Sequence, residues 1–262
     1  MGYYAVKEIY PWLHSIHDPQ NVFCYLVVGS EWALLFDTAH GIGDLHGAIN
    51  EVTDKPVVTV LGHGHLDHAC GAYQFDEVWL HGDDFAVCQR HTSEKYRRHI
   101  LGELAAGGHA LPEGFDGDAY VRAGTGNLKE MAPGQVFDLG GLHVEVVSME
   151  GHTAGSVGLL VREHRVLLDS DSANAHVWVF LPESLPVGRY ADMLERVVRL
   201  DFDTFFTGHS GKPRPKSDFM KYIGAARNVS PEKSEPYPEF PWLKGHLYKE
   251  DGAEIVFSME KL

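Results

Sequence analysis

The sequence predicts an α/β domain in which two β-sheets pack face to face and helices cover them. Three observations predict this class: strand-like apolar runs come in two sets, helical segments follow each set, and no linker separates the two halves. With 262 residues, of which 44% are hydrophobic, the chain can bury a core without disulfides. We therefore expect a single domain over residues 1–262.

The first half of the chain begins with a strand meander and continues with alternating strands and helices. Strands are predicted over residues 3–9, 22–28, 32–36, 57–61 and 75–80, and helices over residues 42–52 and 84–104. Residues 107–127 are rich in glycine and predict a long loop. Residues 84–127 are therefore a candidate helical and loop lid within the domain.

The second half repeats the order of strands followed by a helix. Strands are predicted over residues 142–149, 156–162, 166–168 and 203–206, and a helix over residues 188–200. Residues 230–262 begin with a proline-rich crossing segment and end in a hairpin around Asp251-Gly252, since Asp-Gly is typical of tight hairpin turns. These two sets of strands supply the two sheets.

The charge balance excludes several classes of partner. The chain has 22 Lys and Arg against 37 Asp and Glu, a formal net charge of −15, which argues against nucleic acid or an anionic membrane as a partner. No apolar run approaches the ~18 residues of a spanning helix, and the first residues lack the apolar core of a secretion signal. We expect a cytoplasmic protein with a small-molecule substrate. The oligomeric state stays open, and the edge of the terminal hairpin would allow a dimer.

The most informative stretch is residues 61–71, which reads LGHGHLDHACG. Three imidazoles and one carboxylate follow an apolar strand within six residues: His63, His65, Asp67 and His68. His63 and His65 are two apart, so they project to the same side of an extended or turning backbone and can bind one ion. Asp67 and His68 could face a second ion. A polar turn in solvent is the weaker alternative, because so many ligand-type side chains share one short turn.

Aspartate or histidine follows the end of a predicted strand five times along the chain. The positions are Asp37, the cluster that begins at His63, His152, the pair Asp169 and Asp171, and His209. Side chains at strand ends can converge at one edge of a sheet, where the packed strands hold them rigidly. We therefore expect a single site at that edge.

The ligand count predicts a pair of divalent ions. His63, His65 and His152 would bind one ion, Asp67, His68 and His209 would bind the other, and Asp171 could bridge them. Nitrogen and oxygen ligands with open positions suit Zn²⁺ best and also Fe or Mn. The three cysteines match no C-x-x-C spacing, which excludes a closed thiolate site. Two ions about 3.5–4 Å apart would lower the pKa of a bound water to about 7 and make hydroxide available at neutral pH.

These motifs resemble, in order, those of the metallo-β-lactamase superfamily. The matching elements are HGHLDH at residues 63–68, GHTAGS at 151–156, Asp171 and Gly208-His209, and with Asp37 they cover about two thirds of the chain. The resemblance implies the four-layer αβ/βα sandwich of this superfamily, two mixed sheets with outer helices. It also implies the ligand sets given above, with Asp171 as the bridge and Asp37 hydrogen-bonded behind the ligands.

The fourth motif departs from the usual Gly-Asp, because Ser170 precedes Asp171 and Asp169 lies two residues before it. Asp169 is therefore an alternative bridge. An aspartate bridge resembles the glyoxalase II, lactonase and phosphodiesterase branches more than the β-lactamases. The resemblance then implies a dinuclear hydrolase of a thioester, lactone or carboxylic ester, with Asp67 and Asp171 orienting the attacking hydroxide.

Three other functions remain open from the sequence. The first is a phosphodiester or sulfate-ester hydrolase, because the ligand set does not choose the bond. The second is a mononuclear iron sulfur dioxygenase, which the same superfamily includes. The third is a non-catalytic metal-binding module, which filled ligand positions make the weakest alternative.

Four further residues are candidate substrate contacts. His176 and Trp178 follow Asp171 in a predicted loop that could reach over the metals, with simple packing as the alternative. Lys212 and Arg214 begin a basic stretch after His209 and could pair with an anionic substrate group. A solvated helix face is the alternative for this basic stretch.

Overall fold

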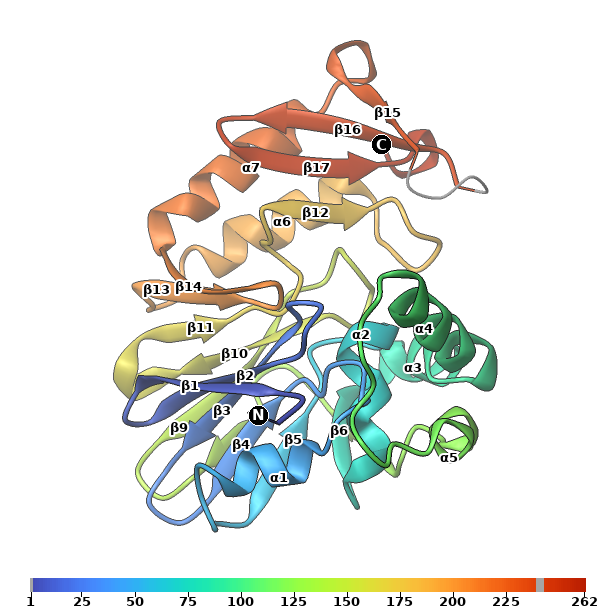
Figure 1. Cartoon of the computed structure of the whole chain (residues 1–262). Helices are drawn as coiled ribbons and strands as arrows, with labels where there is room; N and C mark the ends of the chain where they lie inside the picture. Colours follow the sequence, from blue (N-terminus) through green and yellow to red (C-terminus); the bar gives the residue numbers. More distant parts are fainter. Residues whose placement is uncertain (1, 239–242) are drawn as a thin grey trace.

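The computed structural model describes residues 2–238 and 243–262, and these residues form three mixed β-sheets (Figure 1). Residues 239–242 of the proline-rich segment lie outside the described residues. Among the described residues, no helix is both long and apolar enough to cross a bilayer.

The first sheet has seven strands in sequence order. Its first four strands form an antiparallel meander, one strand more than predicted, and the remaining strands join it in parallel. The strands are β1 (Ala5–Tyr10), β2 (Leu13–His17), β3 (Phe23–Val28), β4 (Ala33–Phe36), β5 (Val57–Val60), β6 (Val78–His81) and β7 (Leu128–Met131). The sequence did not indicate β2 and β7.

The second sheet has six strands in the order β14-β13-β11-β10-β9-β8. All neighbours are antiparallel except β11 and β13, which run in parallel. The strands are β8 (Val136–Asp138), β9 (His143–Ser148), β10 (Val157–Val161), β11 (Val166–Leu168), β13 (Thr204–Thr207) and β14 (Ser210–Pro215). β14 occupies the start of the predicted basic stretch.

The two larger sheets pack face to face, as predicted. Side chains alternate across each strand, so Tyr25 and Phe36 of the first sheet meet Val146, Leu159 and Phe206 of the second in one core. Helices cover the outer faces: α1 (Leu45–Asn50), α2 (Leu66–Ala69) and α3 (Phe85–His91) share a core with the first sheet, and α6 (Val187–Val197) and α7 (Phe219–Asn228) share one with the second. The helices α4 (Glu94–Ala106) and α5 (Gly117–Arg122) pack beside them in a separate cluster with Ile42 and Cys70. This is the four-layer αβ/βα sandwich.

A third sheet of four strands adds a layer beyond α6 and α7 (Figure 1). Its strands are β12 (His176–Val179), β15 (Glu235–Tyr237), β16 (Gly245–Glu250) and β17 (Ala253–Phe257), in the order β12-β17-β16-β15. Val177 and Ile255 of this sheet share a core with Tyr190 of α6 and Tyr222 of α7. The segment that was expected to be a loop after Asp171 therefore carries a strand, because β12 pairs in parallel with β17 far along the chain. Local periodicity cannot show such a pairing.

The candidate lid region also differs from the expectation. The predicted helix over residues 84–104 is two helices, α3 and α4, and the predicted loop contains α5. The helix is interrupted at Thr92, whose hydroxyl donates to the carbonyl of Cys88 and whose own carbonyl accepts from Arg97 Nε. Arg97 is fully buried between the rings of Tyr73 and Tyr120, at 5.0 and 4.7 Å. The region is thus packed onto the body of the domain.

Candidate metal centre

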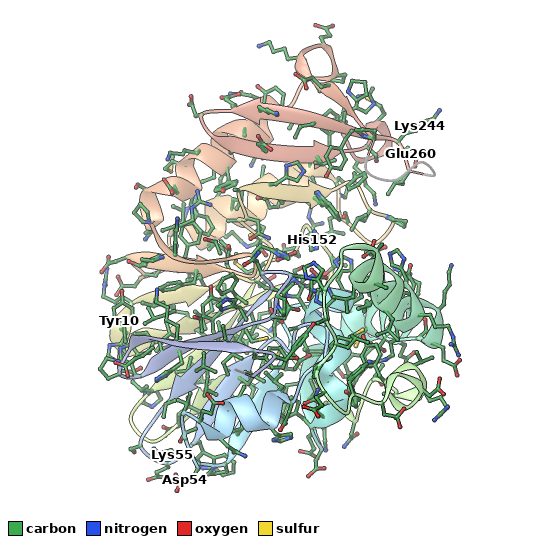
Figure 2. All side chains as sticks on the ribbon, viewed as in Figure 1. Tyr10, Asp54, Lys55, His152, Lys244 and Glu260 are labelled. Atoms are coloured by element: carbon green, nitrogen blue, oxygen red, sulfur yellow. The ribbon has the colours of Figure 1, made fainter. Side chains whose placement is uncertain are left out.

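The candidate ligands lie where strands of both larger sheets end. Asp37 follows β4, the turn from His63 to His68 follows β5, His152 follows β9, Asp171 follows β11 and His209 follows β13. Figure 2 labels His152 at the junction between the two-sheet body and the part of the chain that carries β12. Residues far apart in sequence therefore reach one edge of the sandwich, as the strand-end pattern predicted.

The first cluster consists of three buried imidazoles, His63, His65 and His152, whose nitrogen atoms lie within 4.8 Å of one another. His65 Nδ1 is 2.8 Å from His152 Nε2. Burial lowers the pKa of His63 well below its ordinary value, and burial together with the neighbouring His65 lowers the pKa of His152 to about 4. Imidazoles that stay neutral at pH 7 keep a lone pair available for a metal ion.

Each of the four buried histidines of the two clusters donates its outer N–H to a fixed acceptor. A fixed outer hydrogen bond sets the tautomer and aims the other nitrogen into the site. The pairs are His63 Nδ1 with Ser170 Oγ (3.2 Å), His65 Nε2 with Glu183 Oε1 (2.9 Å), His68 Nδ1 with Asp37 Oδ2 (3.0 Å) and His152 Nδ1 with the carbonyl of Trp178 (2.7 Å).

The second cluster combines two carboxylates with two imidazoles: Asp67, His68, Asp171 and His209. His68 Nε2 is 3.3 Å from oxygens of both aspartates, and His209 Nε2 lies 3.4 and 3.3 Å from them. Burial alone would lower the pKa of both histidines, but the carboxylates, Asp171 first, raise that of His68 well above its ordinary value and that of His209 to about 10. The two carboxylates thus strongly favour a positive charge beside them.

Asp171 lies between the two clusters. One of its oxygens contacts His68 and the other contacts His209 and, at 3.8 Å, His152 of the first cluster. Asn174 Nδ2 donates to Asp171 Oδ1 at 2.8 Å and holds the carboxylate in place. Asp169, the alternative bridge, is fully buried and belongs to neither cluster.

Asp37 lies behind both clusters, in the position that the resemblance implied. Its carboxylate accepts hydrogen bonds from the backbone of Gly62, from His68 and from Ser170 Oγ (2.7, 3.0 and 2.8 Å). Because Ser170 donates to Asp37, its oxygen is left to accept from His63. The serine that departs from the usual Gly-Asp motif therefore connects Asp37 to a ligand of the first cluster.

A second carboxylate behind the ligands is Asp84, which the sequence did not indicate. It is fully buried and accepts from the backbone of Gly64 (2.7 Å), the hydroxyl of Thr153 (2.8 Å) and the backbone of Gly155 (2.9 Å). Gly64 lies between two ligands of the first cluster, and Thr153 follows the third. One carboxylate therefore joins the two loops that supply this cluster.

A pocket of about 360 Å³ opens beside the clusters. The ligands share its lining with side chains that follow Asp171 and His209: Asn174, Ala175, His176, Trp178, Thr207 and Ser210. The candidate contacts His176 and Trp178 thus face the pocket from β12.

The other two candidate substrate contacts do not line this pocket among the described residues. Lys212 is exposed on β14. The guanidinium of Arg214 is bound to Asp218 (3.0 Å), to Tyr222 and to the carbonyl of Ala173 (3.1 Å). The charge of Arg214 is therefore already partly neutralised by Asp218.

No family model matches the chain. Among curated proteins it is 28% identical over 199 residues to the acyl-coenzyme A thioesterase MBLAC2 of Homo sapiens, and the match covers 67% of each chain. It is 23% identical over 164 residues to the probable metallo-hydrolase YqgX of Bacillus subtilis, covering 61% of this chain and 70% of that protein.

A solved structure shares the fold. The archaeal metallo-beta-lactamase superfamily protein from Sulfolobus tokodaii matches 87% of this chain and 90% of its own, with a TM-score of 0.57 and 22% sequence identity. Its fold agrees with the sandwich described above, and the ligand motifs and the curated relatives agree with the sequence resemblance. The chain is therefore similar in fold to a metallo-β-lactamase superfamily protein and similar in sequence to proteins named as metal-dependent or thioester hydrolases.

Proposed function

We propose that this chain is a dinuclear metal hydrolase that cleaves a thioester of a small molecule. The observation that carries the proposal is the pair of ligand clusters that meet at Asp171 beside an open pocket. The similarity to a protein named as an acyl-coenzyme A thioesterase supports a thioester among the ester-type bonds. Water would add to the carbonyl carbon, and the carbon–sulfur bond would break to give a carboxylate and a thiol.

The side chains of both clusters fit a pair of divalent ions. His63 Nε2 is buried without a hydrogen-bond partner among the described residues, and His65 Nδ1 faces His152 Nε2 at 2.8 Å. Inward-facing neutral nitrogens at this spacing suit a cation between them. The second cluster adds carboxylates whose charge an ion would balance. The nitrogen and oxygen donors favour zinc, with iron and manganese as alternatives.

The chain's own residues would position the reactants. Ions held in the two clusters would supply a Lewis acid for the carbonyl oxygen and a water of lowered pKa. Asp171 lies between the clusters, Asp67 belongs to the second cluster, and both line the pocket, where their oxygens could accept a hydrogen bond from the attacking water and orient it. Ala175, His176 and Trp178 line the pocket and offer a surface for one arm of the thioester.

A thiol-release assay tests this function. The zinc-loaded chain is mixed with short- and long-chain acyl-coenzyme A thioesters, and free thiol is followed over time. We expect metal-dependent release that disappears in Asp171→Ala and persists in Asp83→Ala, because Asp83 is exposed outside the clusters. Cleavage of lactones, phosphodiesters or sulfate esters without thioester cleavage would overturn the substrate assignment. Oxygen consumption with a persulfide and one bound iron would overturn hydrolysis itself.

A further inference from the structure

Glu183 lies outside the sequence motifs but contacts a metal ligand. It belongs to residues 180–186, which connect β12 to α6, and its side chain is only 8% exposed. Its Oε1 is 2.9 Å from His65 Nε2 and 3.3 Å from His91 Nε2, and its Oε2 is 2.9 Å from Arg90. Arg90 and His91 end helix α3, so this carboxylate joins two parts of the chain beside the first cluster.

These side chains allow two interpretations. His65, His91 and Glu183 bring ligand atoms within 4.8 Å of one another, so a third ion could be bound by them. However, Arg90 already places a permanent positive charge 2.9 Å from Glu183 and 3.5 Å from His91 Nε2. A divalent ion at the same place would be repelled by this guanidinium. The contacts therefore favour a carboxylate that accepts hydrogen bonds over one that binds a third ion.

We propose that Glu183 is a positioning residue for the first metal, acting through His65. This inference rests on the proposed metal-dependent function. Because a carboxylate only accepts, the proton of His65 is fixed on Nε2 and its Nδ1 is left to face His152. Arg90 and His91 hold Glu183 from the other side, so the carboxylate cannot turn away without breaking three contacts.

The expected effect is confined to the first cluster. Loss of an outer hydrogen-bond partner typically costs about 10- to 100-fold in metal affinity. The second cluster has its own outer partner, because Asp37 holds His68. Removing Glu183 should therefore weaken one of the two bound ions and leave the other unchanged.

Metal titration of the full chain tests the proposal without relying on turnover. Glu183→Ala removes the acceptor, whereas Glu183→Gln keeps an amide oxygen that can accept from His65. Glu163→Ala is a matched control, because Glu163 forms a similar carboxylate–histidine pair with His143 on the surface (2.6 Å). Each protein is freed of metal, titrated with Co²⁺ and Zn²⁺ against a competing chelator, and examined by visible absorption and by element-specific mass spectrometry.

We expect Glu183→Ala to bind one ion as the unchanged chain does and the other about 10- to 100-fold more weakly, with altered Co²⁺ absorption. Glu183→Gln should recover most of the affinity, and Glu163→Ala should show no change. Equal binding of both ions by Glu183→Ala would overturn the proposal. If the unchanged chain binds three ions and Glu183→Ala loses only the third, the proposal is overturned, because Glu183 would then be a ligand of that third ion. Equal weakening of both ions, with a destabilised metal-free chain, would overturn it in favour of a purely structural contact.

The proposed thioester hydrolysis can be overturned without overturning the role of Glu183. If the unchanged chain binds two ions and Glu183→Ala weakens one of them, Glu183 positions His65 even when no thioester is cleaved. If the unchanged chain binds no ion, both proposals are overturned.

Discussion

Replacing Asp84 by asparagine should destabilise the domain, although it changes only one oxygen atom into an amino group. The carboxylate of Asp84 accepts from Gly64 and Thr153 through one oxygen and from Gly155 through the other. An asparagine has a single acceptor oxygen, and its amino group is a donor. At least one of these buried donors therefore loses its acceptor, because the amino group of the asparagine would face it in place of a carboxylate oxygen.

The magnitude follows from the contacts that are lost. An unsatisfied buried donor costs about 1–3 kcal/mol, and hydrogen bonds to a charged acceptor contribute about 1 kcal/mol more than those to a neutral one. We therefore expect Asp84→Asn to lower the free energy of unfolding by about 2–4 kcal/mol. Asp84→Ala, which leaves three donors without an acceptor, should cost more.

Urea unfolding of the metal-free chain measures this change directly. The neighbouring Asp83 is 67% exposed, so Asp83→Asn is a matched control and should lie within about 0.5 kcal/mol of the unchanged chain. The zinc-loaded chain should show a second effect, weaker binding in the first cluster, because Asp84 joins the loops that carry its ligands. An unfolding free energy of Asp84→Asn within about 0.5 kcal/mol of the unchanged chain would show that these hydrogen bonds do not stabilise the fold as expected.

Three further predictions concern the metal centre. Asp171→Ala should lower turnover by more than the about 10- to 100-fold that an outer partner contributes, with an unchanged circular dichroism spectrum; full activity would contradict the role of Asp171. Removing metal with a chelator should lower the melting temperature, since an ion at 100 times its dissociation constant stabilises a fold by about 2.7 kcal/mol; an unchanged melting temperature would argue against binding to the folded chain. Metal-free protein should lose stability as the pH falls from about 6.5 to 5. The folded-state pKa of His152 is lowered to about 4, so the unfolded chain binds more protons than the folded chain in this interval. Once His152 is fully protonated in both states, the loss in the free energy of unfolding amounts to about 3 kcal/mol. His63 acts in the same direction, and a melting temperature that rises on acidification over this interval would contradict this prediction.

Much of the site could be predicted from local sequence because most of its ligand residues lie in short motifs. The turn from His63 to His68 concentrates ligand types, and single ligands follow later strands that reach the same edge. Alternating or continuous apolar runs likewise predict most strands of the two larger sheets, since burial on one or both faces leaves a periodic pattern.

The rest depends on contacts between distant segments. Strand β12 is short and becomes a strand by pairing with β17, so its own residues carry little signal. Asp83 and Asp84 are adjacent and chemically identical, yet one is exposed and the other fully buried among three donors. In the sequence, Glu183 resembles a surface glutamate in a proline-containing segment. In the fold, Arg90 at the end of α3 forms an ion pair with it. Only the folded chain distinguishes these carboxylates from solvated ones.

We propose that two metal ions lie side by side in this site. This is tested by the metal content of the chain, purified without chelators and measured by element-specific mass spectrometry. We expect two divalent ions per chain, zinc before manganese or iron, and we expect both to be lost when His63 and His68 are replaced by alanine together. A single iron per chain, or no metal even after reconstitution, would contradict it.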